Sequence, residues 1–257
     1  MNMKILVVGD SCTDKFIYGK VDRVSPEAPI PVFNPQYETE NYGMAANVAS
    51  NLASFGLDCD LITNKTKIIK TRYVDMKSKQ MLLRVDENDL VLDKDAYLNQ
   101  PITGYDAIII SDYNKGFLNK ESIKKLLDNK VPTFLQSNKL LDTWCLSADF
   151  IKINEKEYQI SKNFIDINKK EFFENLIVTL GENGYLYKNK HVELDKKVDV
   201  RDVSGAGDTF LSAFVFSYLD SLDPIIALKY AQKQSSIIVQ KTGINVAGNE
   251  NLKFNII

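Results

Sequence analysis

Apolar residues gather in short segments spread along this chain. Three segments, at residues 4–9, 106–112 and 176–181, hold unbroken apolar runs that end near glycine, serine or aspartate. Such runs are typical of parallel strands that are buried on both faces of a sheet. Residues 57–63 predict a further strand. Ligands of parallel sheets gather where the strands end, so we expect a site near Asp10 and at the corresponding ends of the other strands.

Segments with helical periodicity lie between these strands. Residues 42–56 are rich in alanine, and their pattern ends at Gly56, a residue suited to a helix C-terminus. Residues 121–129 place Ile123, Leu126 and Leu127 on one face. Further helices are predicted at residues 93–99, 209–219 and 223–240. Strands that alternate with helices favour an α/β fold.

Two regions predict β structure outside this alternation. Residues 16–37 contain Pro26, Pro29, Pro31 and Pro35 between short β-prone pieces. Because proline cannot donate to a central ladder, this region predicts irregular or edge strands. Residues 185–194 predict a hairpin, and its second strand contains the one histidine of the chain, His191. A histidine on an exposed strand argues against histidine catalysis and a histidine-based metal site.

Composition narrows the class of protein. The 257 residues carry 32 basic and 34 acidic side chains, a net charge of −2, which gives no support for nucleic acid or an anionic membrane as a partner. No apolar run approaches the ~20 residues of a membrane span. Three scattered cysteines and no signal peptide predict reduced thiols and a cytoplasmic location. Without repeats or linkers, we expect one domain, residues 1–257.

The segment Asp-Val-Ser-Gly-Ala-Gly-Asp-Thr-Phe at residues 202–210 carries the candidate chemistry. Gly205 and Gly207 let the backbone turn and bring its amides close to a ligand, and the helix that follows adds unpaired donors suited to phosphate. We expect Asp208, in the first turn, to stay ionised at neutral pH because the helix terminus favours its charged form. It could accept a proton in phosphoryl transfer or merely stabilise the helix, and the residues alone favour neither.

Residues 202–209 resemble the C-terminal signature of the ribokinase (PfkB) family of sugar kinases. Residues 7–19, 23–32 and 43–49 closely resemble the kinase domain of D-glycero-β-D-manno-heptose-7-phosphate kinases, and the resemblance runs in order from about residue 4 to about residue 243. It implies a ribokinase-like three-layer α/β/α sandwich with a mostly parallel central sheet. It also implies a small β lid, at about residues 16–40 and 68–88, that covers the sugar and often forms a homodimer contact.

The resemblance assigns roles to individual residues. Asp208 becomes the base, with the amides of Gly205, Ala206 and Gly207 facing the transferred phosphoryl group. The sugar side comprises Asp14, Gly43, Asn47, Arg72, Arg84, Asp112 and Lys115. The ATP side comprises Asn154, Glu157, Thr179, Gly181, Glu182, Gly184, Gln232 and Gly243. Mg²⁺ is expected near Glu157, and a monovalent cation such as K⁺ near Asp202 and Ser204.

The chain departs from the family pattern at three places. Met44 stands where the family usually has a second glycine, which questions the fit of the usual sugar. Gln136 and Asn138 replace an aspartate and a lysine typical of heptose kinases, although Lys139 could compensate. After Thr63 a βα unit is missing, which should shrink the sheet on one side or leave a face open.

We therefore expect an ATP-dependent sugar kinase that phosphorylates the anomeric hydroxyl of a heptose 7-phosphate. A kinase of another sugar or of a small alcohol is kept open by the departures at residues 44, 136 and 138. A non-catalytic binding protein that retains the fold is kept open by the missing βα unit. No P-loop motif and no protein-kinase signature is present.

Overall fold

The computed structural model describes residues 3–91, 102–194, 198–241, 246–248 and 253–257. Within them, a nine-stranded sheet has the order β12-β11-β10-β9-β8-β7-β1-β4-β13. Its six central strands are all parallel. They are β1 (Lys4–Gly9), β4 (Asp58–Thr63), β7 (Ala107–Asp112), β8 (Thr133–Ser137), β9 (Phe150–Asn154) and β10 (Leu176–Thr179). The four strands predicted from apolar runs are confirmed.

Short strands complete both edges of this sheet. At one edge, β11 (Tyr185–Tyr187) and β12 (Lys190–Val192) form the predicted antiparallel hairpin. His191 is exposed there. At the other edge, β13 (Asn255–Ile256) pairs with β4. The helix predicted at residues 93–99 lies outside the described residues.

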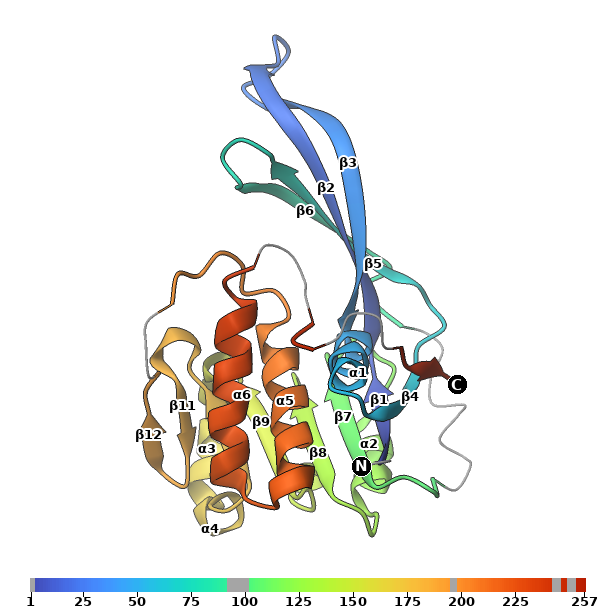
Figure 1. Ribbon diagram of the computed structural model, residues 1–257, viewed down its shortest axis with the longest axis vertical. Coiled ribbons are helices and arrows are strands. Elements are labelled where there is room, and N and C mark those ends of the chain that lie inside the picture. The colour runs from blue at the N-terminus through green and yellow to red at the C-terminus, as the bar shows by residue number, and fades with distance from the viewer. Residues whose placement is uncertain (1–2, 92–101, 195–197, 242–245, 249–252) are drawn as a thin grey trace.

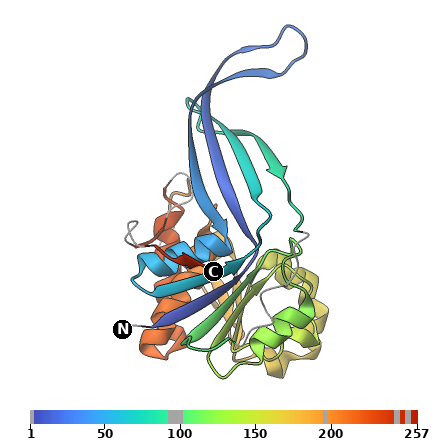
Figure 2. The same ribbon diagram turned by 90° about the vertical axis from the view of Figure 1, so that its right-hand side faces the viewer.

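Helices cover both faces of the sheet, which gives the three expected layers (Figures 1 and 2). One layer contains α1 (Ala45–Ser54), α5 (Ala206–Ser221) and α6 (Pro224–Ile238), and the other contains α2 (Lys120–Leu127), α3 (Glu155–Ile167) and α4 (Lys169–Phe172). Successive strand residues point to opposite layers, as the period of a strand requires. Ile5 and Val7 therefore join the first core cluster and Leu6 and Val8 the second.

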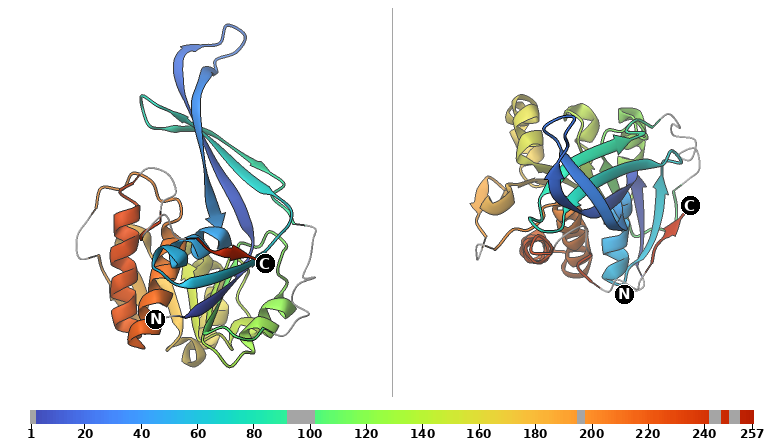
Figure 3. Two further views of the ribbon diagram at one scale, coloured as in Figure 1. Left: turned by 45° about the vertical axis from the view of Figure 1, so that its right-hand side comes forward. Right: turned by 90° about the horizontal axis from the view of Figure 1, so that it is seen from above.

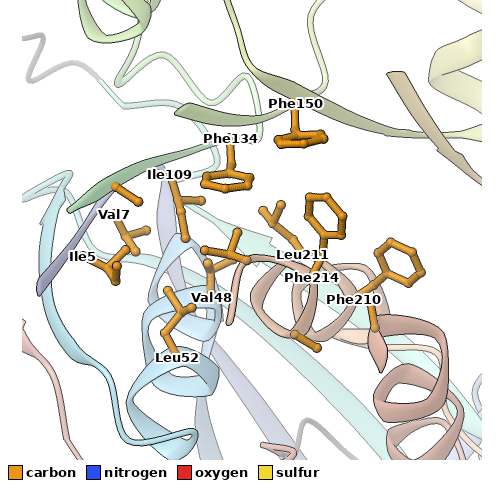
Figure 4. Packing of buried hydrophobic residues seen from close by; sticks show 14 of the residues in the cluster. Ile5, Val7, Val48, Leu52, Ile109, Phe134, Phe150, Phe210, Leu211 and Phe214 are labelled. Atoms are coloured by element: carbon orange, nitrogen blue, oxygen red, sulfur yellow. The ribbon is translucent and has the colours of Figure 1, made fainter. Parts of the chain in front are cut away.

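The first cluster seats the helix that begins at the glycine-rich segment. Leu211 and Phe214 of α5 lie against Phe134 and Phe150 of the sheet, and Val48 of α1 lies beside them (Figure 4). α5 is buried along most of its length. This packing fixes the position of its first turn relative to the ends of β8 and β9.

A separate four-stranded sheet rises from the body and forms the lid (Figures 1 and 3). Its strands are β2 (Ser11–Val24), β3 (Pro31–Met44), β5 (Ile68–Asp75) and β6 (Met81–Glu87), in the order β3-β2-β5-β6. β1 continues through Asp10 directly into β2. The first lid segment therefore spans residues 11–44 and is longer at both ends than the predicted residues 16–40. The prolines are tolerated because β3 is an edge strand with register shifts against β2.

The missing βα unit has a visible consequence. β4 leads through residues 64–67 into lid strand β5, and the two-residue strand β13 takes the place beside β4. Asp60 of β4 holds this edge, because its carboxylate accepts from Lys4 Nζ (2.7 Å), Tyr105 Oη (2.9 Å) and Asn255 Nδ2 (3.1 Å). The sheet edge is therefore covered by the C-terminal segment.

Candidate active site

A cavity of about 550 Å³ opens at the carboxyl ends of the central strands. This volume lies within the range of small-molecule sites. The polar part of its wall comes from the ends of β8, β9 and β10 and from the start of α5. The apolar part includes Val198, Val200, Val203, Phe210 and Val239. Seven residues predicted for ATP line this cavity: Asn154, Glu157, Thr179, Gly181, Glu182, Gly184 and Gln232. Gly243 lies outside the described residues.

The glycine-rich segment begins α5 beside the cavity. Gly205 has a φ of 78°, in the left-handed region, and caps the helix without a side-chain bond. The amide of Ala206 donates to the carbonyl of Val203 (3.2 Å), so it is not one of the open donors that the sequence predicted. Among the described residues, the amides of Gly205, Gly207 and Asp208 have no hydrogen-bond acceptor. These amides can receive an anion.

Asp208 is 4% exposed and is not part of the cavity wall, but its carboxylate contacts Tyr113 and Gln136, which are. Oδ2 accepts from Asn47 Nδ2 (2.9 Å), and Oδ1 accepts from Tyr113 Oη and from Gln136 Nε2 (3.4 Å). Burial raises the pKa of Asp208, and the hydrogen bonds from Tyr113 and Asn47 oppose that rise. The expectation based on the helix terminus alone had the wrong direction, because desolvation outweighs the helix dipole at a fully buried carboxylate.

Tyr113 is the contact of Asp208 that sequence reasoning missed. It follows β7 in the loop 113–117, and its side chain lines the cavity. Asp10, fully buried at the end of β1, accepts from the amides of Tyr113 (2.8 Å), Lys115 (3.2 Å) and Phe117 (3.2 Å). Asp10 therefore fixes the loop that presents Tyr113 to Asp208.

The residues predicted for the sugar gather where the lid meets the body. Asp14 of β2 is buried and pairs with Arg72 of β5, whose guanidinium also lies over the Phe16 ring. Gly43 leaves the space for this carboxylate, because a Cβ at that position would overlap Asp14 and Cys12. Asn47 lies on α1 and contacts Asp208, as described above. These residues connect the lid to the candidate base.

A second group of predicted residues forms an ionic network across the lid strands. Arg84 of β6 binds Asp86 through two hydrogen bonds of 2.8 Å. Asp86 also accepts from Lys70 (3.1 Å), which in turn binds Asp89 (2.8 Å), and Asp89 pairs with Lys115. The basic groups predicted for a sugar phosphate are thus held close together, each beside a carboxylate that an incoming phosphate would have to displace.

Asp112 does not face the cavity as a substrate ligand would. It is fully buried, and its carboxylate accepts from Ser137 Oγ, Lys139 Nζ (2.6 Å) and the amide of Asn114 (3.1 Å). Its role in the structure is to hold the loops after β7 and β8. Lys139, which could have replaced a missing lysine, is engaged in the same contact.

The residues predicted to bind metal ions lie at two places, the start of α3 and the turn before α5. Asn154 and Glu157 form a capping box at the start of α3, where the Asn154 side chain accepts from the Glu157 amide and Glu157 accepts from the Asn154 amide. Both also line the cavity. Asp202 accepts from the amide of Ser204 (2.8 Å) in the turn before α5. No cluster of three or more metal-binding side chains occurs among the described residues.

Lys152 is a further cavity residue that the sequence did not single out. It lies on β9 beside Gln136 of β8, and its ammonium donates to Gln136 Oε1 (2.9 Å). The side chain is buried, and burial lowers its pKa. Its position in the segment Phe150–Asn154, between two isoleucines, gave no signal of contact with a ligand.

Comparison with known proteins agrees with this geometry. Residues 114–251 match the family described as pfkB family carbohydrate kinase. A curated relative, the bifunctional protein HldE of Nitratiruptor, is 29% identical over 302 residues, which cover 98% of this chain and 65% of the relative. The chain thus spans about 65% of the length of the curated relatives it matches.

Solved structures have the same fold at low identity. Phosphofructokinase-2 from Escherichia coli in complex with potassium superposes with a TM-score of 0.76 at 14% identity, covering 97% of this chain and 96% of that one. Arabidopsis thaliana ribokinase complexed with ribose and ATP gives 0.69 at 15% identity, covering 97% and 96%. The fold is the ribokinase-like α/β/α sandwich.

The family match, on this fold, defines the class of an ATP-dependent carbohydrate kinase. This chain belongs to the pfkB family of carbohydrate kinases. Within its described residues, no helix is both long and apolar enough to span a bilayer.

Proposed function

We propose that this protein transfers the γ-phosphoryl group of ATP to the anomeric hydroxyl of a heptose 7-phosphate. The observation that carries the proposal is the placement of Asp208 against the cavity wall, with the open amides of Gly207 and Asp208 at the start of α5. A base that orients a hydroxyl, next to donors that stabilise a moving phosphoryl group, is what this reaction requires.

In the proposed reaction, Asp208 accepts the proton of the sugar hydroxyl while that oxygen attacks the γ-phosphorus and ADP leaves. Asn47 and Tyr113 hold the two carboxylate oxygens and keep the buried group ionised. Because burial raises the pKa of Asp208, its carboxylate is a stronger base than an exposed aspartate.

The residues around the nucleotide position fit a bound Mg²⁺. Glu157 offers one carboxylate on the cavity wall, and Mg²⁺ typically takes few carboxylates and completes its shell with water and phosphate oxygens. When bound, Mg²⁺ would neutralise charge on the β- and γ-phosphates. Asp202 and Ser204 are the proposed residues of a monovalent-cation site, in the turn that precedes the anion-binding amides.

The heptose part of the proposal is supported by the segments at residues 7–19, 23–32 and 43–49 and by the similarity to HldE proteins. The 7-phosphate would bind the basic groups at the base of the lid: Lys70, Arg72, Arg84 and Lys115. A guanidinium can engage two phosphate oxygens at once, which suits Arg84 on its exposed strand.

Further proposals concern the context of the reaction. Residues 1–257 would act as one kinase domain. A homodimer would form through the lid, whose outer strand β6 exposes Met81, Leu83 and Val85. A cytoplasmic location agrees with three buried cysteines that form no disulfide.

A kinase of another sugar is the second candidate, favoured by Gln136 at a position where heptose kinases carry a charge. The test is an ATP-consumption assay over sugar 7-phosphates, sugar 6-phosphates and free sugars, with Asp208→Asn as the control. Turnover that is fastest on a heptose 7-phosphate and absent in the control supports the proposal. Turnover on a free hexose alone would exclude the heptose assignment. Binding without turnover on any sugar would favour a non-catalytic protein.

A further inference from the structure

The ammonium group of Lys152 lies where the ends of β8 and β9 meet the first turn of α5. Its one described hydrogen bond goes to a neutral acceptor, Gln136 Oε1 (2.9 Å). A lysine ammonium carries three donors, so two remain for another partner. Among the described residues, neither Glu157 nor Asp208 forms an ion pair with it, although both favour its charged form. A buried cation with one neutral acceptor is costly unless an anion joins it.

The first turn of α5, which contains Gly207, faces this ammonium group. A Cβ built on Gly207 would lie 2.9 Å from Lys152 Nζ, so the two are in direct contact. Gly205 is favoured by its left-handed backbone, whereas at Gly207 a side chain would displace the Lys152 ammonium group from its present position. The amide of Gly207 and the ammonium of Lys152 therefore border the same point of the cavity.

Strand order explains how the lysine reaches this point. Lys152 is the register partner of Gln136 on β8 and lies two residues before Asn154, where the capping box begins α3. Its ammonium thus lies between the residues proposed for the nucleotide and the start of α5. By the resemblance, heptose kinases carry an aspartate at position 136 and a lysine near position 138, where this chain has Gln136 and Asn138.

We infer that Lys152 is a further catalytic residue, which binds the γ-phosphoryl group and supplies the positive charge that the missing lysine near position 138 would carry. This inference rests on the proposed phosphoryl transfer. During the transfer the bond from γ-phosphorus to the bridging oxygen breaks and the bond to the sugar oxygen forms. The sugar proton passes to Asp208, and Lys152 stays protonated and donates to the phosphoryl oxygens throughout.

The test compares Lys152→Met with Lys125→Met, which removes an exposed lysine of α2, a helix that contributes no residue to the cavity wall. Methionine keeps the length of the side chain, and because Lys152 forms no ion pair among the described residues, its loss leaves no opposite charge of such a pair uncompensated. We expect kcat to fall about 10²–10³-fold in Lys152→Met, as for other lost charge-stabilising donors, with a smaller change in the KM for ATP. Lys125→Met should match the wild type.

Calorimetric binding of ADP and of a non-hydrolysable ATP analogue separates this inference from the proposed function. In Lys152→Met the affinity for the triphosphate should fall at least about tenfold while ADP binding is retained. Gln136→Glu should have the same effect, because a carboxylate there would hold the ammonium in an ion pair. If the wild type turns over no sugar, the proposed function fails and this binding comparison still decides the role of Lys152. An unchanged triphosphate preference in both variants, or kcat within threefold of the wild type, would overturn the inference.

Discussion

Removal of the Tyr113 hydroxyl should change how activity depends on pH. The phenol donates to Asp208 Oδ1, and this bond is one of the contacts that oppose the rise of the Asp208 pKa caused by burial. Tyr113→Phe keeps the ring that lines the cavity and removes only the donor. The ionised carboxylate then loses stabilisation, so the pKa of Asp208 should rise further.

The magnitude follows from the charge on the acceptor. A hydrogen bond to a charged group contributes about 1.5–3 kcal/mol, and 1.36 kcal/mol corresponds to one pH unit, so the acid limb of kcat/KM should move up by roughly 1–2 pH units. The sign is fixed because catalysis needs the ionised form. Activity of the variant should therefore fall at low pH and approach that of the wild type as pH rises.

The assay is kcat/KM for the sugar phosphate, measured across pH, since this ratio reports the groups of the free enzyme. ATP and sugar phosphate titrate equally in every variant, so the difference between profiles isolates the protein. Tyr218→Phe is the matched control, because Tyr218 is half-buried, packs against Phe134 and Phe150 at the edge of the core, and does not line the cavity. An acid limb that does not move in Tyr113→Phe would refute the assigned contact or the role of Asp208 as the base.

Three further outcomes are expected. Asp208→Asn should lower kcat about 10²–10⁴-fold with near-native unfolding by circular dichroism, since it removes the base and keeps the volume. Gly43→Ala should displace Asp14 and raise the KM for the sugar well above that for ATP in steady-state kinetics; equal changes in both would contradict the placement of Asp14. Asp60→Asn should cost about 1–3 kcal/mol in urea unfolding at pH 7, because Lys4 and two neutral donors lose a charged acceptor. Burial raises the pKa of Asp60, but its hydrogen bonds outweigh burial and hold the pKa below the ordinary value of 3.8. The cost of Asp60→Asn should therefore disappear as pH falls through the folded-state pKa of Asp60. A cost that persists in acid would contradict the assigned contacts.

The sequence predicted the elements well because their signals are local. Apolar segments gave four of the six central strands, β1, β4, β7 and β10, but not β8 or β9. The residues after these strands gave the edge of the sheet where the cavity lies. The limits of the lid were less accurate. The resemblance placed the first lid segment at about residues 16–40, whereas β2 and β3 run from Ser11 to Val24 and from Pro31 to Met44.

The contacts inside the site could not be predicted, because they depend on which strands are neighbours. Lys152 meets Gln136 only because β9 lies beside β8, and Tyr113 meets Asp208 only because Asp10 folds the loop after β7 back toward β1. The direction of the Asp208 pKa shift could not be predicted for the same reason. Its position in the first turn is visible in the sequence, but the depth of its burial is set by α1, β7 and β8 together.

Met44 illustrates how a departure from a family pattern changes meaning once the structure is known. A side chain beside Gly43 suggested an obstacle to the sugar, but Met44 is 6% exposed and packs in the core cluster with Cys12, Ile62 and Ile68. What is unusual is its backbone, with φ at 59° where α1 begins. A non-glycine residue in that region costs about 1–3 kcal/mol, which the burial of a large apolar side chain can offset. Methionine at position 44 therefore adds core packing and accepts a strained backbone. The space for the Asp14 carboxylate depends on Gly43.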